Sequence, residues 1–156
     1  MLALACMAAL AVPAQADEKV GVTAGNPSSG TDETAVAGYA FDRPELLADQ
    51  LVWGIAYGAR LLALACARQG NGVAAEAWVA WQEREQAQIL AIGQRLSQHY
   101  FSRTDAPPDA LAVALGLRPA LALPPEQLAP ACATLAEALT QPRYDLSKRR
   151  EEMLKK

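Results

Sequence analysis

His99 is the side chain whose type could supply a catalytic base in this chain. His99 is the single histidine, and a serine or cysteine nucleophile usually requires a histidine base. No Gly-x-Ser-x-Gly sequence surrounds a serine, so a hydrolase of that type is not predicted. Because His99 falls near the end of a predicted helix, stabilisation by the helix dipole is a sufficient role for it. An enzyme that pairs His99 with a carboxylate is the weakest of three hypotheses.

The residues that could bind a metal or a cofactor do not occur at the spacings that such sites require. The chain has no His-Glu-x-x-His sequence and no pair of histidines at helical spacing, so the usual zinc patterns are missing. A Cys-x-x-Cys-His haem attachment sequence and a phosphate-binding glycine loop are missing too. We therefore predict no catalytic residue, no metal and no cofactor.

Glu85 is the polar residue whose position most needs an explanation. It lies four residues after Trp81 and four before Ile89, inside the apolar stripe of a predicted helix, where an unpartnered carboxylate is costly to bury. Three arrangements are open: the carboxylate reaches water, it pairs with a cation such as Arg60 of the preceding helix, or it lines a pocket. The first two are structural, and only the third would make Glu85 part of a binding site.

Trp78 and Trp81 form a second candidate surface. They are three residues apart and so lie on the same side of a helix. Large aromatic side chains pack the cores of small domains, but an exposed tryptophan is also a common anchor at protein interfaces. Burial of both rings would indicate core packing, whereas exposure of either ring would favour a partner protein.

Cys66 and Cys132 are predicted to form a structural disulfide. They are the two cysteines that remain once an N-terminal signal segment, which contains Cys6, is removed. An even pair in an exported chain favours a disulfide because oxidising compartments let such bonds persist. The alternative is two separate buried thiols. No Cys-x-x-Cys spacing points to redox activity.

The first 42 residues predict export. Met1–Ala16 is an uncharged apolar run that ends in Val-Pro-Ala-Gln-Ala, with small residues where a signal peptidase cuts. Residues 17–42 are rich in Gly, Ser, Thr and Asp and lack apolar periodicity, so we expect a flexible acidic leader. The chain is then periplasmic or secreted after cleavage near Ala16. The alternative is a cytosolic protein with a buried N-terminal helix.

Two long helices joined by a short turn are the clearest structural prediction. A capping residue followed by proline, at Asp42-Arg43-Pro44, is typical of a helix start. This helix is expected to reach Gln69, where Gly70-Asn71-Gly72 ends it. Its predicted buried stripe comprises Leu47, Leu51, Ile55, Gly58, Leu62 and Cys66. With a second helix from Val73 to Tyr100, the pair predicts an antiparallel helical hairpin.

Prolines divide the last third of the chain into short helices. One is expected to start at Pro107-Pro108, and another at Pro124-Pro125 or from Pro130. We therefore predict an all-α fold, in which a long antiparallel helical hairpin is packed by two or three shorter proline-bounded helices and tied by one disulfide. The helical domain is expected over residues 43–146, followed by a charged C-terminal tail over 147–156.

Charge excludes some classes of partner, and the missing catalytic patterns leave binding as the expected function. A net charge of −3 and a pI near 5.2 argue against a nucleic-acid partner, and Arg60 argues against a transmembrane span in the first long helix. We expect a non-catalytic periplasmic or secreted protein-interaction module. The alternative is a small-ligand carrier with a pocket between helices near Glu85. The candidate interaction or pocket residues are Trp78, Trp81, Glu85, Arg60 and His99.

Overall fold

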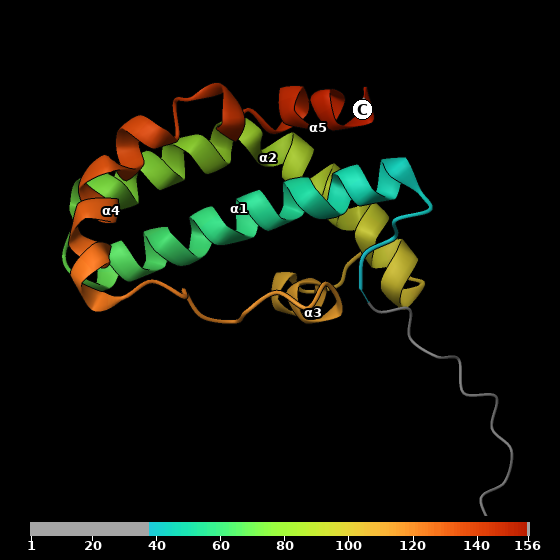
Figure 1. Ribbon diagram of the computed structural model, residues 1–156, viewed down its shortest axis with the longest axis horizontal. Coiled ribbons are helices and arrows are strands. Elements are labelled where there is room, and N and C mark those ends of the chain that lie inside the picture. Colours follow the sequence, from blue (N-terminus) through green and yellow to red (C-terminus); the bar gives the residue numbers. More distant parts are fainter. Residues whose placement is uncertain (1–37, 156) are drawn as a thin grey trace, which may run out of the picture. The chain divides into compact units, whose positions relative to one another are not determined.

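The protein is all-helical over the residues that the structure describes, 38–155 of a computed structural model (Figure 1). The predicted signal segment and most of the predicted leader lie outside these residues. The elements, in chain order, are α1 (Pro44–Arg68), α2 (Gly72–Phe101), α3 (Pro108–Ala114), α4 (Pro125–Ala138), the 3-10 turn η1 (Pro142–Tyr144) and α5 (Leu146–Leu154). The predicted all-α fold is confirmed.

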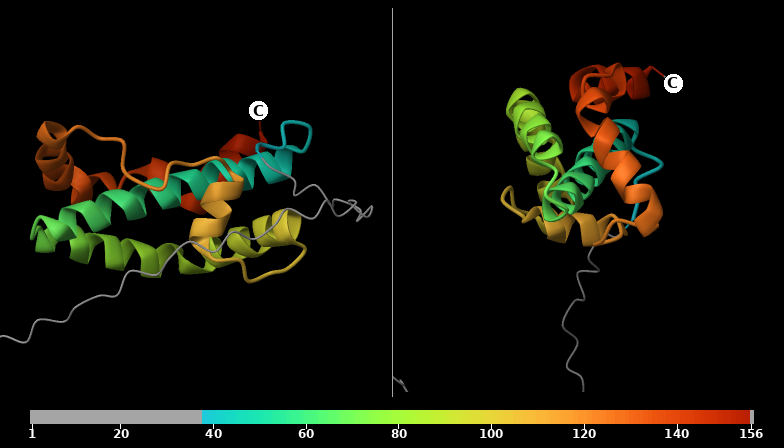
Figure 2. Two further views of the ribbon diagram at one scale, coloured as in Figure 1. Left: turned by 90° about the horizontal axis from the view of Figure 1, so that it is seen from below. Right: turned by 90° about the vertical axis from the view of Figure 1, so that its left-hand side faces the viewer.

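Helices α1 and α2 form the predicted antiparallel hairpin (Figures 1 and 2). Pro44 is the first residue of α1, where its missing N–H costs nothing. The N-cap residue is Arg43, and no side chain caps the helix. At the turn, Gly70 has a φ of +77°, which glycine adopts without strain. The side chain of Asn71 accepts the amide of Ala74 at 3.0 Å and caps α2.

The buried side of α1 matches the predicted stripe only in part: Cys66 is fully buried, and Ile55 and Leu62 pack against the core. Leu51, a member of that stripe, is 39% exposed, whereas Val52 is fully buried. The large residues Trp53 and Tyr57 are buried outside that stripe. Four small residues are buried there as well: Ala48, Ala56, Ala59 and Ala63. Close contact between helices favours small side chains at such positions, and α1 contacts α2, α3, α4 and α5, so more than one of its sides is covered.

Helix α1 is also long and apolar enough to cross a membrane, judged by length and composition alone. The core helix of a globular domain has the same properties, because it too is buried on several sides. Here α1 is covered by the other α-helices and holds Asp49 and Gln50, which are 1% and 0% exposed. Burial within the protein therefore accounts for the composition of α1.

Prolines begin the shorter helices, as predicted. Pro108, Pro125 and Pro142 lie in the first turn of α3, α4 and η1. Helix α4 continues through Pro130, so the alternative start at Pro130 is wrong. The segment between α3 and α4 runs back beside α1, and α4 contacts both helices of the hairpin near its turn (Figures 1 and 2).

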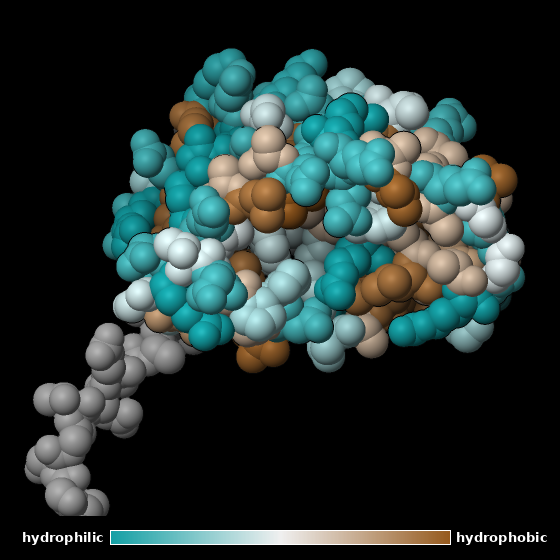
Figure 3. All heavy atoms as spheres, turned by 180° about the vertical axis from the view of Figure 1, so that it is seen from behind, coloured by the Kyte–Doolittle hydropathy of each residue, from teal (hydrophilic) through white to brown (hydrophobic). Residues whose placement is uncertain are grey.

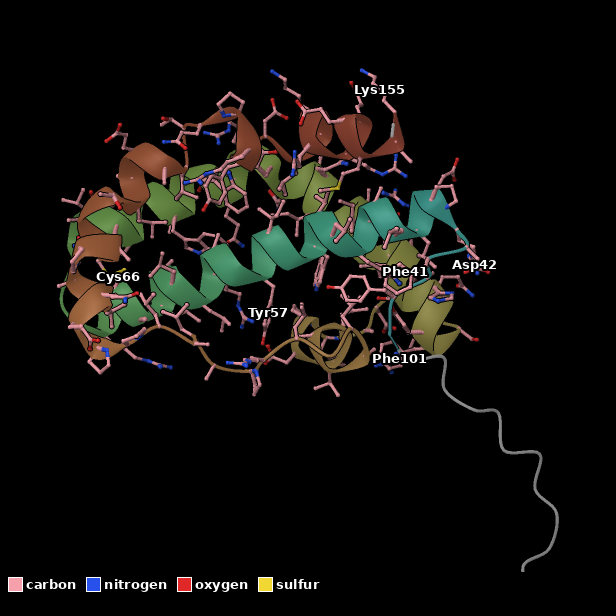
Figure 4. All side chains as sticks on the ribbon, in the orientation of Figure 1. Phe41, Asp42, Tyr57, Cys66, Phe101 and Lys155 are labelled. Carbon is pink, nitrogen blue, oxygen red and sulfur yellow. A yellow bond between two sulfur atoms is a disulfide. The ribbon has the colours of Figure 1, made fainter. Side chains whose placement is uncertain are left out.

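The predicted disulfide joins Cys66 of α1 to Cys132 of α4. The two Cα atoms are 5.5 Å apart, and both residues are buried. The bond ties α4 to the end of α1 that leads into the turn (Figure 4). Because the bonded cysteines are 66 residues apart, the chain-entropy model assigns the bond about 4 kcal/mol of stabilisation.

Both ends of the described chain are attached to the long helices. Gly38 N donates to Ala114 O at 2.9 Å, and Ala40 N donates to Gln50 Oε1 at 2.9 Å. Gly38 O in turn accepts the Tyr100 hydroxyl at 2.6 Å. The end of the predicted leader is thus bonded to α1, α2 and α3. The predicted charged tail forms α5, which packs against α1 and α2.

Candidate functional site

Glu85 is buried, and its two carboxylate oxygens hold the start of α5. Oε2 accepts the backbone N–H of Leu146, the first residue of α5, at 3.1 Å. Oε1 accepts Nε of Arg84 at 3.0 Å. The first amides of a helix have no acceptor within that helix, and the helix dipole favours a negative charge beside them. Glu85 is therefore a structural residue whose two oxygens are both occupied.

Of the three arrangements left open for Glu85, pairing with a cation is found, but that cation is not Arg60. Arg60 donates to Asp109 of α3 at 2.9 Å, on another side of α1. The cation beside Glu85 is its chain neighbour Arg84, which also donates to Leu139 O at 3.1 Å. The surface beside Glu85 is an open depression of about 540 Å³ along the loop before α5, so it does not form the enclosed pocket that a carrier centred on Glu85 requires.

The two tryptophans of α2 have different environments. Trp81 is 1% exposed, and its Nε1 donates to Tyr144 O at 2.8 Å. The Trp81 ring therefore belongs to the core, and it meets the Tyr144 ring edge to face. Trp78 is half-buried, with its ring centroid 5.1 Å from that of Trp81. Of the two, Trp78 is the residue that a partner could contact.

Trp78 forms one wall of an apolar groove of about 360 Å³, which we call the aromatic groove. The groove is lined by Trp53, Ala56, Tyr57, Arg60 and Leu64 of α1, by Trp78, Gln82 and Ile89 of α2, and by Pro108 of α3. A Cβ atom at Gly93 would lie 3.3 Å from the Trp53 ring. The missing side chain at Gly93 thus lets the Trp53 indole pack directly against α2.

A second depression, of about 400 Å³, adjoins the aromatic groove. It lies between α1, α3 and residues 117–121, and it shares Tyr57, Arg60 and Leu64 with the groove. We call these three shared residues the ridge; Tyr57 is 6% exposed, whereas Arg60 and Leu64 are partly exposed. Figure 4 shows Tyr57 midway along α1 on the side of α3. Leu64 is 41% exposed, so an apolar side chain of the ridge is available to a partner.

On the face seen from behind, Figure 3 shows hydrophobic residues in several patches that are interrupted by hydrophilic ones. Individually exposed apolar residues, such as Phe41, Val73 and Leu90, are ordinary on protein surfaces and need no partner.

His99 is not placed as a catalytic base would be. Its Nδ1 lies 3.4 Å from Nη1 of Arg43, and because a guanidinium only donates, Nδ1 accepts and Nε2 carries the proton. Burial, and then the charge of Arg43, lower the pKa of His99, against a smaller opposing effect of Asp42. No carboxylate of the described chain hydrogen-bonds to the ring. Within residues 38–155, no three His, Cys, Asp or Glu side chains are grouped to hold a metal.

His99 lines a polar cleft of about 810 Å³ formed by the start of α1, the end of α2, and α5. At its base lies the carboxylate of Asp49. Oδ2 accepts Arg95 Nε at 2.6 Å, and Oδ1 accepts Arg95 Nη2 at 3.0 Å and Arg150 Nε at 2.6 Å. The hydrogen bond to Asp49 raises the pKa of Arg95. One buried carboxylate therefore joins a cation of α2 to a cation of α5.

Asp49, Arg95 and Arg150 were not predicted as a site. Asp49 did leave a signal, because an acidic residue inside an apolar helix requires a partner if it is buried. The partner could not be identified, since Arg150 is 101 residues away along the chain and lies in a segment whose mixed charge is typical of a solvated tail.

Replacing Glu85 with Ala should release the start of α5. The variant leaves the buried amide of Leu146 without its acceptor, which costs about 1–3 kcal/mol. We expect a lower free energy of unfolding and faster amide hydrogen exchange throughout α5. Glu83→Ala, at an exposed neighbouring position, is the control and should change neither quantity. Equal exchange of α5 in the two variants would contradict the structural role of Glu85.

Known proteins offer no guide to these surfaces. No family model matches the chain, and neither a curated protein nor a solved structure matches it. The function is therefore inferred from the side chains that line the aromatic groove, the ridge and the polar cleft.

Proposed function

We propose that this chain is an exported, non-catalytic binding protein that recognises a segment of another protein at the ridge. The observation that carries this proposal is the pair of adjoining depressions that share Tyr57, Arg60 and Leu64. A polypeptide can place one side chain in each depression, whereas a small ligand would fill only one. Recognition of peptides through a few apolar anchors set in neighbouring pockets is a common mode of protein binding.

The lining residues favour a partner segment with two apolar side chains and a nearby acidic residue. Trp78, which is half-buried, supplies aromatic surface for an apolar anchor, whereas Trp53 and Tyr57, which also line the groove, are only 7% and 6% exposed. Arg60 lines both depressions and is partly neutralised by Asp109. Arg68 lines the second depression and makes no ion pair within the described chain. Two arginines against one aspartate leave a positive edge that an acidic residue would complement.

Export is supported by two features of different kinds. The Cys66–Cys132 bond is of a type that persists in oxidising compartments, and Met1–Ala16 has the composition of a cleavable signal. We expect the protein recovered from the exported fraction of its host to have a mass that begins at Asp17 and is two hydrogens lighter than the reduced chain. A chain that retains Met1–Ala16 would contradict export.

Selection of displayed peptides on the purified full chain tests recognition at the ridge. We expect the selected peptides to carry two apolar residues and an acidic residue. Leu64→Asp puts a charge on the ridge, at a position exposed enough to tolerate it. It should weaken the binding of a selected peptide by about tenfold or more, because a carboxylate must then be buried against an apolar anchor.

Val79→Asp is the matched control, since Val79 is 52% exposed on α2 and lines neither depression. Its peptide affinity should equal that of the unmodified protein. Two results would contradict the proposal: equal weakening by both variants, or recovery of no peptide. Binding of a small aromatic probe such as indole without any peptide would instead identify the aromatic groove as a small-ligand site.

A further inference from the structure

The polar cleft holds more hydrogen-bond donors than its buried carboxylate uses. Arg95 gives Nε and Nη2 to Asp49, and Arg150 gives only Nε. Nη1 of Arg95 and both Nη atoms of Arg150 make no hydrogen bond to the described residues, although both side chains line the cleft. Arg43 brings a third guanidinium to the cleft, beside His99.

Asp49 fixes Arg95 and Arg150 before any ligand arrives. Its side chain is 2% exposed, so it positions the two guanidiniums and is itself closed to a ligand. The side chains of Arg95 and Arg150 are 44% and 23% exposed, so they reach both the buried carboxylate and solvent. Binding to arginines that are already ordered avoids part of the entropy cost of holding flexible side chains.

The start of α1 adds to the positive potential of the cleft. This helix has 25 residues and no side-chain cap, and Glu45 and Leu46 of its first turn line the cleft. Uncapped amides at the start of a long helix favour a bound anion. The lining holds three carboxylates and three guanidiniums, so its formal charge is balanced. The Asp42, Glu45 and Arg43 side chains are all exposed, and water and salt screen their charges.

We infer that the polar cleft binds a small organic acid or phosphate ester, whose oxyanion is held by Arg95 and Arg150 with Arg43 beside them. The forked guanidinium group suits both carboxylate and phosphate, because it can donate two parallel hydrogen bonds. The cleft is an open depression of about 810 Å³, so the rest of such a molecule would remain in contact with solvent. The site shares no lining residue with the ridge, so it is a second function and does not depend on the protein-binding proposal.

Calorimetric titration of the full chain at low salt, with inorganic phosphate and with succinate as probes, tests this site. Parallel NMR spectra of the single histidine report binding at the cleft. We expect at least one probe to bind, to shift the His99 signals, and to bind more weakly as salt is added. Arg43→Gln, which leaves the bonds of Asp49 intact, should weaken binding about fivefold through loss of one charged donor. Arg118→Gln removes an exposed arginine outside the cleft and should have no effect.

Arg150→Lys provides a second variant, because lysine keeps a positive charge beside Asp49 but lacks the paired N–H donors of the guanidinium group. We expect about a tenfold loss of affinity with unchanged helical content. Binding of phosphate alone would assign a phosphate-bearing ligand, and binding of succinate alone a carboxylic acid. The inference would be overturned if the Kd of both probes exceeded about 10 mM. It would also be overturned if Arg43→Gln and Arg118→Gln weakened binding equally, because that result would show an adventitious charge effect.

Discussion

The buried carboxylate of Asp49 is the constraint on which the arrangement of the helices depends. Removing a carboxylate from water costs on the order of several kcal/mol unless charged partners replace the lost hydration. Asp49 obtains those partners from two other helices, Arg95 of α2 and Arg150 of α5. A single charge on α1 therefore specifies where α2 and α5 must lie. Apolar packing is less directional than these ion pairs and would not by itself fix the positions of α2 and α5 as closely.

The hairpin is secured differently at its two ends. At the end of α1 that leads into the turn, the Cys66–Cys132 bond attaches α4 covalently. At the other end, α5 is attached through Asp49 and, at its first residue, through Glu85 of α2. Between these attachments lies the ridge, and at the Asp49 end lies the polar cleft. Both proposed binding surfaces are thus built on α1, the helix that the rest of the structure covers.

Local patterns in the sequence predicted those features of the fold that depend on neighbouring residues. The helical hairpin follows from apolar periodicity and from the turn at Gly70, and the short helices follow from their prolines. The disulfide followed from compartment and cysteine count. The bonds from Glu85 to Leu146 and from Asp49 to Arg150 could not be predicted, because they join residues 61 and 101 positions apart. The aromatic groove was not predicted. Trp78 and Arg60 line it but were candidates for other reasons, and Trp53 and Tyr57 gave no signal beyond that of ordinary core aromatic residues.

A double-mutant cycle between Asp49 and Arg150 tests most directly whether this ion pair organises the domain. The free energy of unfolding would be measured for the unmodified protein, for Asp49→Ala, for Arg150→Ala and for the double variant. We predict that Arg150→Ala costs less in the Asp49→Ala background, with a coupling of at least about 1 kcal/mol, because the two residues act through one shared contact. Losses that add to within about 0.5 kcal/mol would contradict this role for Asp49.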